Sequence, residues 1–290
     1  MADKLVLEHI SYVYSKNTPF ETEALSDVSV AFETGKITGL IGHTGSGKST
    51  LVQMLNGLLR PTSGRVLLDG TDIFSLKKKE LAKICFRVGL VMQYPEYQLF
   101  DETVRRDIGY GPRNMRLSEE EVAERVTEGI RFAEFPEALL DKSPFELSGG
   151  QKRRAAIAGV MAMRPEVLVL DEPAAGLDPR GKTEILSGIR EYAKKTGATV
   201  ILVSHSMEDM ALYCDNIAVM NHGRLYTYGK TEEVFGAANL LSEAGLDIPE
   251  VSRIAVALRR LGYPLTGKLY TVDGVADAVL RLIKGGDGRD

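Results

Sequence analysis

The sequence predicts an α/β fold with a mainly parallel sheet, and three observations lead to this prediction. Apolar runs typical of buried strands occupy residues 167–170 and 199–203, with a helical stretch at 183–195 between them. A further strand-like run at 37–41 leads into a glycine-rich segment. Apolar residues then recur at helical spacing until Pro61 ends the helix. This alternation is typical of parallel strands joined by crossover helices.

Shorter patterns predict the parts that flank this sheet. Strand-like runs at 4–10, 28–32 and 65–68, separated by glycine turns, predict a strand-rich entry region. A mostly helical insertion is expected over about 86–163, because Ser118 and the three glutamates after it form a typical helix start.

The last 50 or so residues have the pattern of an appendage. A break at Gly236, Gly245 and Pro249 precedes two new helical periodicities. Their apolar residues are Val251, Ile254, Ala255 and Leu258, and then Val275, Val279, Leu282 and Ile283. We expect a small helical cap packed on the core, with a subunit contact as the alternative.

Composition excludes several classes of protein. The 290 residues carry 36 Lys plus Arg against 40 Asp plus Glu, a net charge of −4, so the basic excess needed to bind a nucleic acid backbone is absent. The strand-like apolar runs are only a few residues long, whereas a membrane span needs about 20. Cys85 and Cys214 show no metal-like spacing and suit a reducing compartment. We expect no leader peptide, no transmembrane segment and no nucleic acid partner.

The glycine-rich segment fits the pattern of a phosphate-binding loop. It consists of Gly42, His43, Thr44, Gly45, Ser46, Gly47, Lys48 and Ser49, followed by Thr50. In such loops the backbone N–H groups surround a β-phosphate and the lysine reaches the β and γ oxygens. The N-terminus of the following helix favours a polyphosphate over a neutral ligand. We therefore expect Lys48 to bind phosphate and Ser49 to ligate Mg²⁺.

Two acids follow the apolar strand at 167–170. Asp171 and Glu172 would lie at the carboxyl edge of the sheet, where open α/β folds bind their ligands. There Asp171 would help to hold Mg²⁺, and Glu172 would orient and deprotonate an attacking water. Taken alone, two acids after a strand are more often solvated turn residues. Their combination with the glycine loop favours the catalytic interpretation.

A second anion-binding helix start is predicted further along the chain. Ser148, Gly149, Gly150 and Gln151 precede a helical segment that ends before Pro165. Ser148 is a good N-cap, and the glycine-lined helix start presents free N–H groups to an anion. A capped helix without a ligand is the alternative.

In this order the motifs resemble the ATP-binding cassette (ABC) ATPases over most of residues 4–235. The resemblance implies a P-loop NTPase core with an antiparallel β subdomain within residues 1–235. It also implies a helical subdomain with the signature motif at about 93–163, and leaves 236–290 as a C-terminal helical extension.

The same resemblance assigns roles to further residues. Gln93 is similar to the Q-loop glutamine, which acts in catalysis and ligates the metal, and His205 to the catalytic switch histidine. Asp178 lies in a D-loop-like segment beside the nucleotide. Tyr14 is similar to the aromatic residue that stacks on adenine, with Tyr12 as an alternative.

The resemblance also implies a site shared by two protomers. One would offer Lys48, Ser49, Gln93, Asp171, Glu172 and His205 to ATP and Mg²⁺, and the facing protomer would offer its signature residues 148–151 to the γ-phosphate. ATP would then hold two subunits together, hydrolysis would release them, and a lone chain should hydrolyse ATP poorly.

Three further segments indicate a particular branch of the ABC ATPases: residues 93–100, residues 143–146 before the signature, and the C-terminal extension. They are similar to the ATPases of energy-coupling-factor importers for vitamins or transition-metal ions, most of all to the second of the two ATPase subunits. The implied partners are a second ATPase, a paralogue more readily than an identical copy, a transmembrane coupling subunit and a substrate-binding membrane subunit. Glu96, Asp101 and Glu102 are candidate acceptors for arginines of the coupling subunit.

Two functions follow from these observations. The first is an ATPase that energises an importer from the cytoplasmic face of the cell membrane, as a peripheral subunit. The alternative is a soluble ABC protein that acts on ribosomes or DNA. Such proteins usually carry two cassettes or a long coiled coil, whereas this chain has one glycine loop and no heptads.

Overall fold

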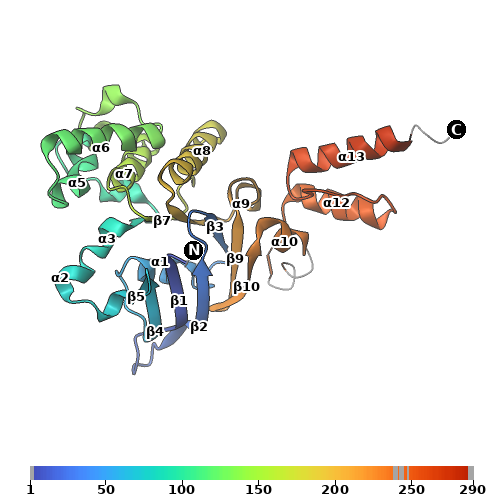
Figure 1. The fold of residues 1–290 in the computed structure, drawn as a ribbon, viewed down its shortest axis with the longest axis horizontal. Coiled ribbons are helices and arrows are strands. Elements are labelled where there is room, and N and C mark those ends of the chain that lie inside the picture. The colour runs from blue at the N-terminus through green and yellow to red at the C-terminus, as the bar shows by residue number, and fades with distance from the viewer. Residues whose placement is uncertain (1–2, 238–240, 242–244, 247, 287–290) are drawn as a thin grey trace.

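The computed structural model describes residues 3–237, 241, 245–246 and 248–286. Two sheets lie at the centre, a group of helices gathers at one end, and a pair of helices extends at the other (Figure 1). None of the helices in this described part of the chain combines the length and the apolar character that crossing a bilayer requires.

The main sheet has six strands in the order β10-β9-β3-β8-β7-β6. The strands from β9 to β6 are parallel, and only β10 runs antiparallel to its neighbour. Every residue of β3, β7 and β8 is buried, as expected for strands covered on both faces. The strands are β3 (Ile37–Ile41), β6 (Val88–Val91), β7 (Val167–Asp171), β8 (Thr199–Val203), β9 (Asn216–Asn221) and β10 (Arg224–Lys230).

The entry region forms a separate four-stranded sheet in the order β2-β1-β4-β5. Its strands pair antiparallel throughout, so the predicted strand-rich entry region is present. The strands are β1 (Leu5–Tyr14), β2 (Thr22–Phe32), β4 (Ser63–Leu68) and β5 (Thr71–Asp72). Helix α1 (Lys48–Leu55) shares one apolar core with this sheet and with one face of the main sheet. The phosphate-loop helix is therefore fixed between the two sheets.

The insertion expected to be mostly helical over about 86–163 begins with a strand instead. Residues 88–91 form β6 and pair in parallel with β7, from Val88 opposite Val167 to Val91 opposite Leu170. A Val-Gly-Leu-Val run that is almost entirely buried has no polar alternation, so its pattern cannot separate a strand from a helix. The helical expectation was wrong for these four residues.

Beyond β6 the insertion is helical. At Ser118 the predicted cap is confirmed, since its hydroxyl accepts a hydrogen bond from the N–H of Glu121 at 3.3 Å and its own N–H donates to that side chain at 2.8 Å. The elements are the 3₁₀ turns η2 (Pro95–Gln98), η3 (Glu137–Leu139) and η4 (Pro144–Glu146), and helices α4 (Val104–Ile108), α5 (Tyr110–Asn114), α6 (Glu119–Phe132) and α7 (Gly149–Ala162).

Helix α8 (Pro179–Thr196) joins this insertion to the main sheet. A Cβ placed on Gly188 would lie 1.9 Å from the carbonyl oxygen of Phe132, so the absence of a side chain there lets α8 approach the end of α6. The remaining short elements are η1 (Ile73–Ser75), α2 (Lys78–Leu81), α3 (Ile84–Arg87), α9 (Met207–Tyr213) and α10 (Thr231–Gly236).

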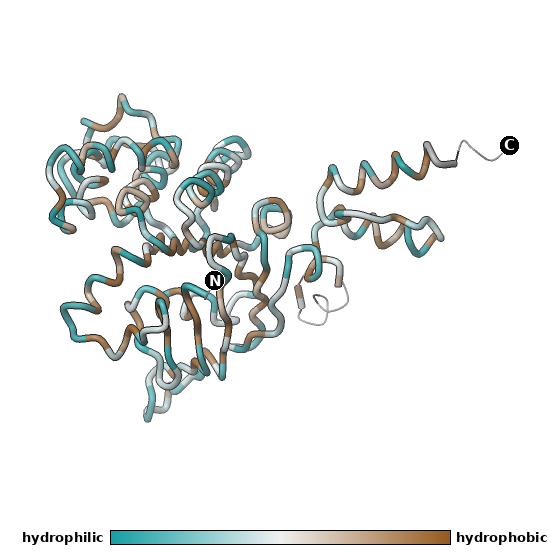
Figure 2. Tube along the Cα trace, viewed as in Figure 1, coloured by the Kyte–Doolittle hydropathy of each residue, from teal (hydrophilic) through white to brown (hydrophobic). Residues whose placement is uncertain are grey.

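The C-terminal extension forms a helix pair, α12 (Glu250–Arg260) and α13 (Val272–Gly286). Part of the predicted range 236–290 lies outside the described residues. The pair has a small apolar cluster of its own around Ala255 and Val275, and in Figure 2 apolar and polar segments alternate along it. Ile254 and Ile283 remain 53% and 61% exposed. The expected cap on the main core is thus a hairpin that packs chiefly on itself, because its two helices face each other.

Candidate active site

The glycine loop connects β3 to α1 and is shaped by close backbone contacts. A Cβ on Gly42 would lie 2.4 Å from the carbonyl oxygen of Met220, and one on Gly47 would lie 2.7 Å from that of Ala24. Gly47 also has a φ of 99°, a left-handed conformation that side chains rarely adopt. Glycine at these positions lets the loop turn tightly into the N-terminus of α1.

Lys48 points back into this loop. Its ammonium, on a residue only 6% exposed, donates hydrogen bonds to the carbonyl oxygens of Gly42 at 2.7 Å and His43 at 2.9 Å. Burial lowers the pKa of Lys48, and the nearby charges of Asp171 and Glu172 oppose this change. The result is a buried cation at the N-terminus of α1, an arrangement suited to a polyphosphate.

Asp171 ends β7 next to this loop, as the strand pattern predicted. Burial raises the pKa of its carboxyl, while a hydrogen bond from Ser49 and the charge of Lys48 oppose the rise. The two residues predicted to hold Mg²⁺, Ser49 and Asp171, line one cavity. Gln93, which follows β6, lines the same cavity.

These three side chains offer a hydroxyl, a carboxylate and an amide oxygen. Oxygen ligands of this kind are the donors that Mg²⁺ prefers. The donor set therefore fits a magnesium ion whose remaining ligands would be water and phosphate oxygens.

Glu172 is the residue after β7 and has a strained backbone. Its φ is 53°, and its N–H donates to the carbonyl oxygen of Val203 at 3.0 Å, which ties it to the end of β8. Burial, reinforced by the neighbouring Asp171, raises the pKa of Glu172 to about 7. A carboxyl with a pKa near neutrality is suited to accept a proton from water.

The Glu172 carboxylate has a free hydrogen-bonding position. Its Oε1 atom is buried without a hydrogen-bond partner among the described residues, and lies 3.7 Å from Nε2 of His205. Buried polar atoms are nearly always paired, so this oxygen is suited to bind a water. His205 follows β8 and faces the same position, as the motif order predicted.

One cavity of about 410 Å³ contains this chemistry. Tyr14 also lines it, and the hydroxyl of Tyr14 lies 3.1 Å from that of Thr50. Tyr12 does not line it and packs partly against the core, edge-on to Tyr14 at 4.7 Å. Sequence reasoning missed Thr22, Glu23, Ala24 and Val203, which also line the cavity. These four residues lie at strand ends and belong to no motif. Their closeness to the motif residues Tyr14 and His205 is the signal that could have identified them.

The structure separates the signature residues from this cavity. Ser148, Gly149, Gly150 and Gln151 begin α7, and the predicted cap is confirmed: the hydroxyl of Ser148 accepts from the N–H of Gln151 at 3.3 Å. None of the four lines the cavity around Lys48. Asp178 likewise lies outside it and caps α8, accepting from the N–H of Gly181 at 2.6 Å.

His43 also points away from the cavity, toward the turn between β9 and β10. Its Nε2 lies 3.1 Å from Oδ1 of Asn221, and its ring is 5.0 Å from that of His222. In the same turn, the N–H of Gly223 donates to the carbonyl oxygen of Ser46 at 3.2 Å. The turn therefore supports the outer side of the phosphate loop, a contact that the loop motif alone did not indicate.

The three acids proposed to receive a partner all pair within the chain. Glu96 contacts Arg153 at 3.3 Å, and Asp101 and Glu102 contact Arg106 at 3.0 and 2.7 Å. Glu102 is 82% exposed. Of the three, Glu102 is the most open to an additional cation.

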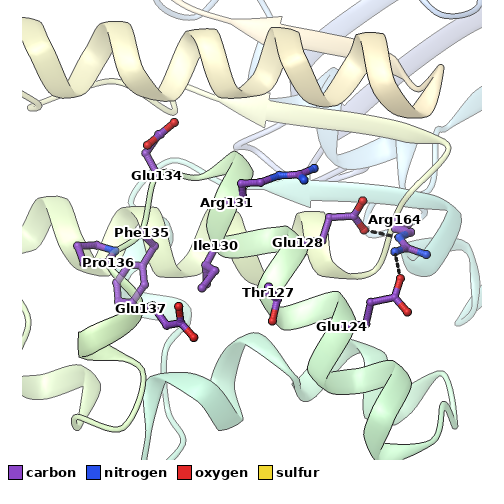
Figure 3. Close-up of a pocket in the computed structure, with 10 residues that line it drawn as sticks. All are labelled: Glu124, Thr127, Glu128, Ile130, Arg131, Glu134, Phe135, Pro136, Glu137 and Arg164. Atoms are coloured by element: carbon purple, nitrogen blue, oxygen red, sulfur yellow. Dashed lines mark hydrogen bonds and ion pairs between the residues drawn. The ribbon is translucent and has the colours of Figure 1, made fainter.

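A larger cavity, of about 840 Å³, lies elsewhere, along α6 (Figure 3). It contains none of the residues predicted to bind ATP. Its acids Glu124 and Glu128 pair with Arg164, and Figure 3 shows Glu134 and Glu137 on the other side. With four carboxylates and two arginines, its lining does not suit a phosphate.

Comparison with known proteins agrees with the fold. Residues 25–175 match the sequence profile of the ABC transporter family. The solved structure of cbiO1 from Clostridium perfringens, described as part of the ABC transporter complex cbiONQ, matches with a TM-score of 0.74 and 39% identity, over 89% of this chain and all of that one. The dimeric ABC cassette MJ0796, bound to ADP and phosphate after hydrolysis, gives a TM-score of 0.72 at 27% identity, over 78% of this chain and 98% of that one. Fold and site together define an ABC ATPase.

Full-length relatives specify the branch of the family. The energy-coupling factor transporter ATP-binding protein EcfA2 of Caldanaerobacter subterraneus is 50% identical over 279 residues, which cover 96% of this chain and 97% of that protein. EcfA2 of Clostridium perfringens is 49% identical, with 96% and 98% covered. The chain belongs to the energy-coupling factor transporter ATP-binding proteins.

This membership confirms the family, the fold class and the ATPase activity that the motifs predicted. ATP is the ligand of the family, and hydrolysis is coupled to transport across a membrane. The alternative, a protein that acts on ribosomes or DNA, is not favoured by these relatives.

Proposed function

We propose that the chain is the ATP-hydrolysing subunit of an energy-coupling-factor importer for vitamins or transition-metal ions. One observation supports the hydrolytic role above the others: a buried Glu172 with a pKa of about 7 faces the space beside Lys48 and Asp171, with one carboxylate oxygen lacking a partner in the described part of the chain. A base of this kind at the γ-phosphate end of an ATP cavity is suited to activate water.

In the proposed mechanism the triphosphate binds along the loop. Backbone N–H groups of residues 42–49 and the Lys48 ammonium bind its β- and γ-phosphates, and Tyr14 stacks on the adenine. Ser49, Asp171 and Gln93 would hold Mg²⁺, which when bound neutralises phosphate charge. Glu172 takes a proton from the attacking water, and His205 contacts the γ-phosphate.

The site is completed by a second ATPase subunit. Residues 148–151 lie outside the cavity of their own chain, and their helix start presents N–H groups suited to a γ-phosphate. The dimeric form of the related cassette MJ0796 supports this arrangement. Asp178 would lie beside the nucleotide at the same interface. We favour a paralogous partner, with a homodimer as the alternative.

The remaining partners are a transmembrane coupling subunit and a substrate-binding membrane subunit. The chain would attach to them as a peripheral subunit at the cytoplasmic face of the cell membrane. Glu102 is suited to receive an arginine of the coupling subunit, because its side chain is the most exposed of the three candidate acids.

Two experiments test this proposal. Glu172→Gln in the assembled complex should retain ATP binding and lower turnover by at least ~10²-fold, as expected on loss of a general base. Wild-type turnover in this variant would show that another group acts as the base. Expression with the flanking genes, followed by membrane solubilisation and mass spectrometry, should recover a hydrophobic coupling subunit. Recovery of the chain without one from a competent host would contradict the transport role.

A further inference from the structure

Arg153 and Glu96 form an ion pair inside the helical subdomain. Arg153 lies on α7, two residues after the signature residue Gln151, and its side chain is 7% exposed. Its Nε and Nη2 atoms donate to the Glu96 carboxylate at 3.3–3.4 Å. Glu96 lies on the turn η2, and its side chain is 20% exposed. The pair thus joins the signature helix to the segment that begins at Gln93.

That segment is held at two points. Gln93 lines the ATP cavity and precedes Glu96 by only three residues. Three residues of chain span at most about 10 Å, so the ion pair lies close to Gln93. At the other end, the buried carboxylate of Asp107 accepts hydrogen bonds from the N–H groups of Phe100 and Asp101, each at 3.1 Å. Between these points the turn η2 packs against α7.

The Arg153–Glu96 ion pair fixes the relative position of two segments more than it stabilises the fold. A buried ion pair contributes little net stability, because the desolvation of both charges offsets their attraction. Its bonds are long, and Nη1 of Arg153 is buried without a hydrogen-bond partner among the described residues. What the pair provides is a fixed geometry, since an arginine fork fits one orientation of a carboxylate.

We propose that Arg153 is a positioning residue that acts through Glu96. It keeps Gln93 in register with the signature helix of the same chain, so that the position of Gln93 in the ATP cavity is coupled to the surface offered to the facing subunit. Arg153 contacts neither ATP nor the attacking water. The inference rests on the proposed function, because it concerns communication between two sites of an ATPase dimer.

The test uses the full chain in its assembled complex with three variants. Arg153→Met removes the charge, Glu96→Gln is nearly isosteric, and the third variant combines both. We expect kcat to fall about tenfold in each single variant while KM for ATP stays within about threefold, because orientation and not ground-state binding is lost. The kcat of the double variant should lie within about twofold of the kcat of the less active single variant, as expected for two residues that act as one unit.

Arg164→Met is the matched control. Arg164 forms ion pairs with Glu124 and Glu128 in the same subdomain, where it joins the end of α7 to α6. This variant should lower thermal stability at least as much as Arg153→Met and leave kcat within about twofold. A tenfold loss of kcat in the control as well would reduce the role of Arg153 to structural support and overturn the inference.

Hydrogen exchange gives a readout that does not need activity. The amides of Tyr94 and of residues 96–99 should exchange at least about fivefold faster in Arg153→Met and Glu96→Gln than in the wild type or in Arg164→Met. If the wild-type complex is active and both exchange and kcat are unchanged in Arg153→Met and Glu96→Gln, this inference is refuted while the proposed function stands. An inactive wild-type complex would instead count against the proposed function.

Discussion

The acid–base behaviour of Glu172 gives the most direct test of the site. Its pKa of about 7 arises from burial and from the neighbouring Asp171, and only the ionised carboxylate can accept a proton from water. About a tenth of the carboxyl is ionised at pH 6 and about nine tenths at pH 8. We therefore expect kcat/KM for ATP, which reports the free enzyme, to rise about tenfold over this range and then level off.

The assay is phosphate release by the assembled complex at constant ionic strength and saturating Mg²⁺. Glu172→Gln should remove the rise together with most of the activity. His205→Gln should lower activity and keep the shape of the profile, because the base itself is unchanged. A wild-type profile that is flat between pH 6 and 8 would refute the assignment of the raised pKa to the catalytic base.

The same carboxyl also affects stability. The folded protein binds its proton up to pH about 7, whereas in the unfolded chain the pKa is near 4.5. The stability associated with this proton is thus full below pH 4.5 and is lost as the pH rises to 7, by about 3 kcal/mol at most. Glu172→Gln, which stays neutral, should melt higher than the wild type at pH 8 and show a smaller difference at pH 5. An equal difference at both pH values would contradict this account.

Three further changes test other parts of the structure. Lys48→Ala should weaken ATP binding about 50-fold by calorimetry, since charge-assisted hydrogen bonds to the phosphates are lost; retained affinity would remove that role. Tyr14→Ala should lower affinity for ATP about tenfold through lost stacking, while Tyr14→Phe should stay within about threefold, and equal affinities would place the adenine elsewhere. Gly188→Ala should cost about 2 kcal/mol in denaturant unfolding, because its Cβ would lie 1.9 Å from a backbone oxygen. The control Gly236→Ala, whose Cβ would meet nothing within 4 Å, should change stability little.

The chemistry of the site was largely predictable because it follows strand ends. The run at 37–41 coincides with β3 and the run at 199–203 with β8, and Lys48 and His205 follow these two strands in the chain. The run at 167–170 lies in β7, and Asp171 is the last residue of that strand. Carboxyl ends of parallel strands meet at one edge, so correct strands place these side chains together.

Contacts between distant parts of the chain could not be predicted in the same way. Strand β6 had no alternation to separate it from a helix, and the support of the phosphate loop by the β9–β10 turn depends on tertiary contact. A signal for that turn does exist: Asn221, His222 and Gly223 separate two strand-like runs, and the φ values of 45° and 74° at His222 and Gly223 suit a two-residue hairpin. Ion pairs such as Arg153 with Glu96 join residues 57 apart and leave no local pattern.

The hairpin turn behind the phosphate loop has a consequence for the kinetics of ATP capture. The N–H of Gly223 donates to the carbonyl oxygen of Ser46, and the carbonyl oxygen of Gly223 accepts a hydrogen bond from the N–H of Ser26 at 2.8 Å. Because Ser26 lies on β2, these bonds connect the phosphate loop to the four-stranded sheet before any nucleotide binds. A preorganised cradle loses little conformational entropy when it is filled. Capture of ATP by a single subunit should then proceed in one diffusive step, and the slow events of the cycle should belong to the meeting and parting of the two ATPases.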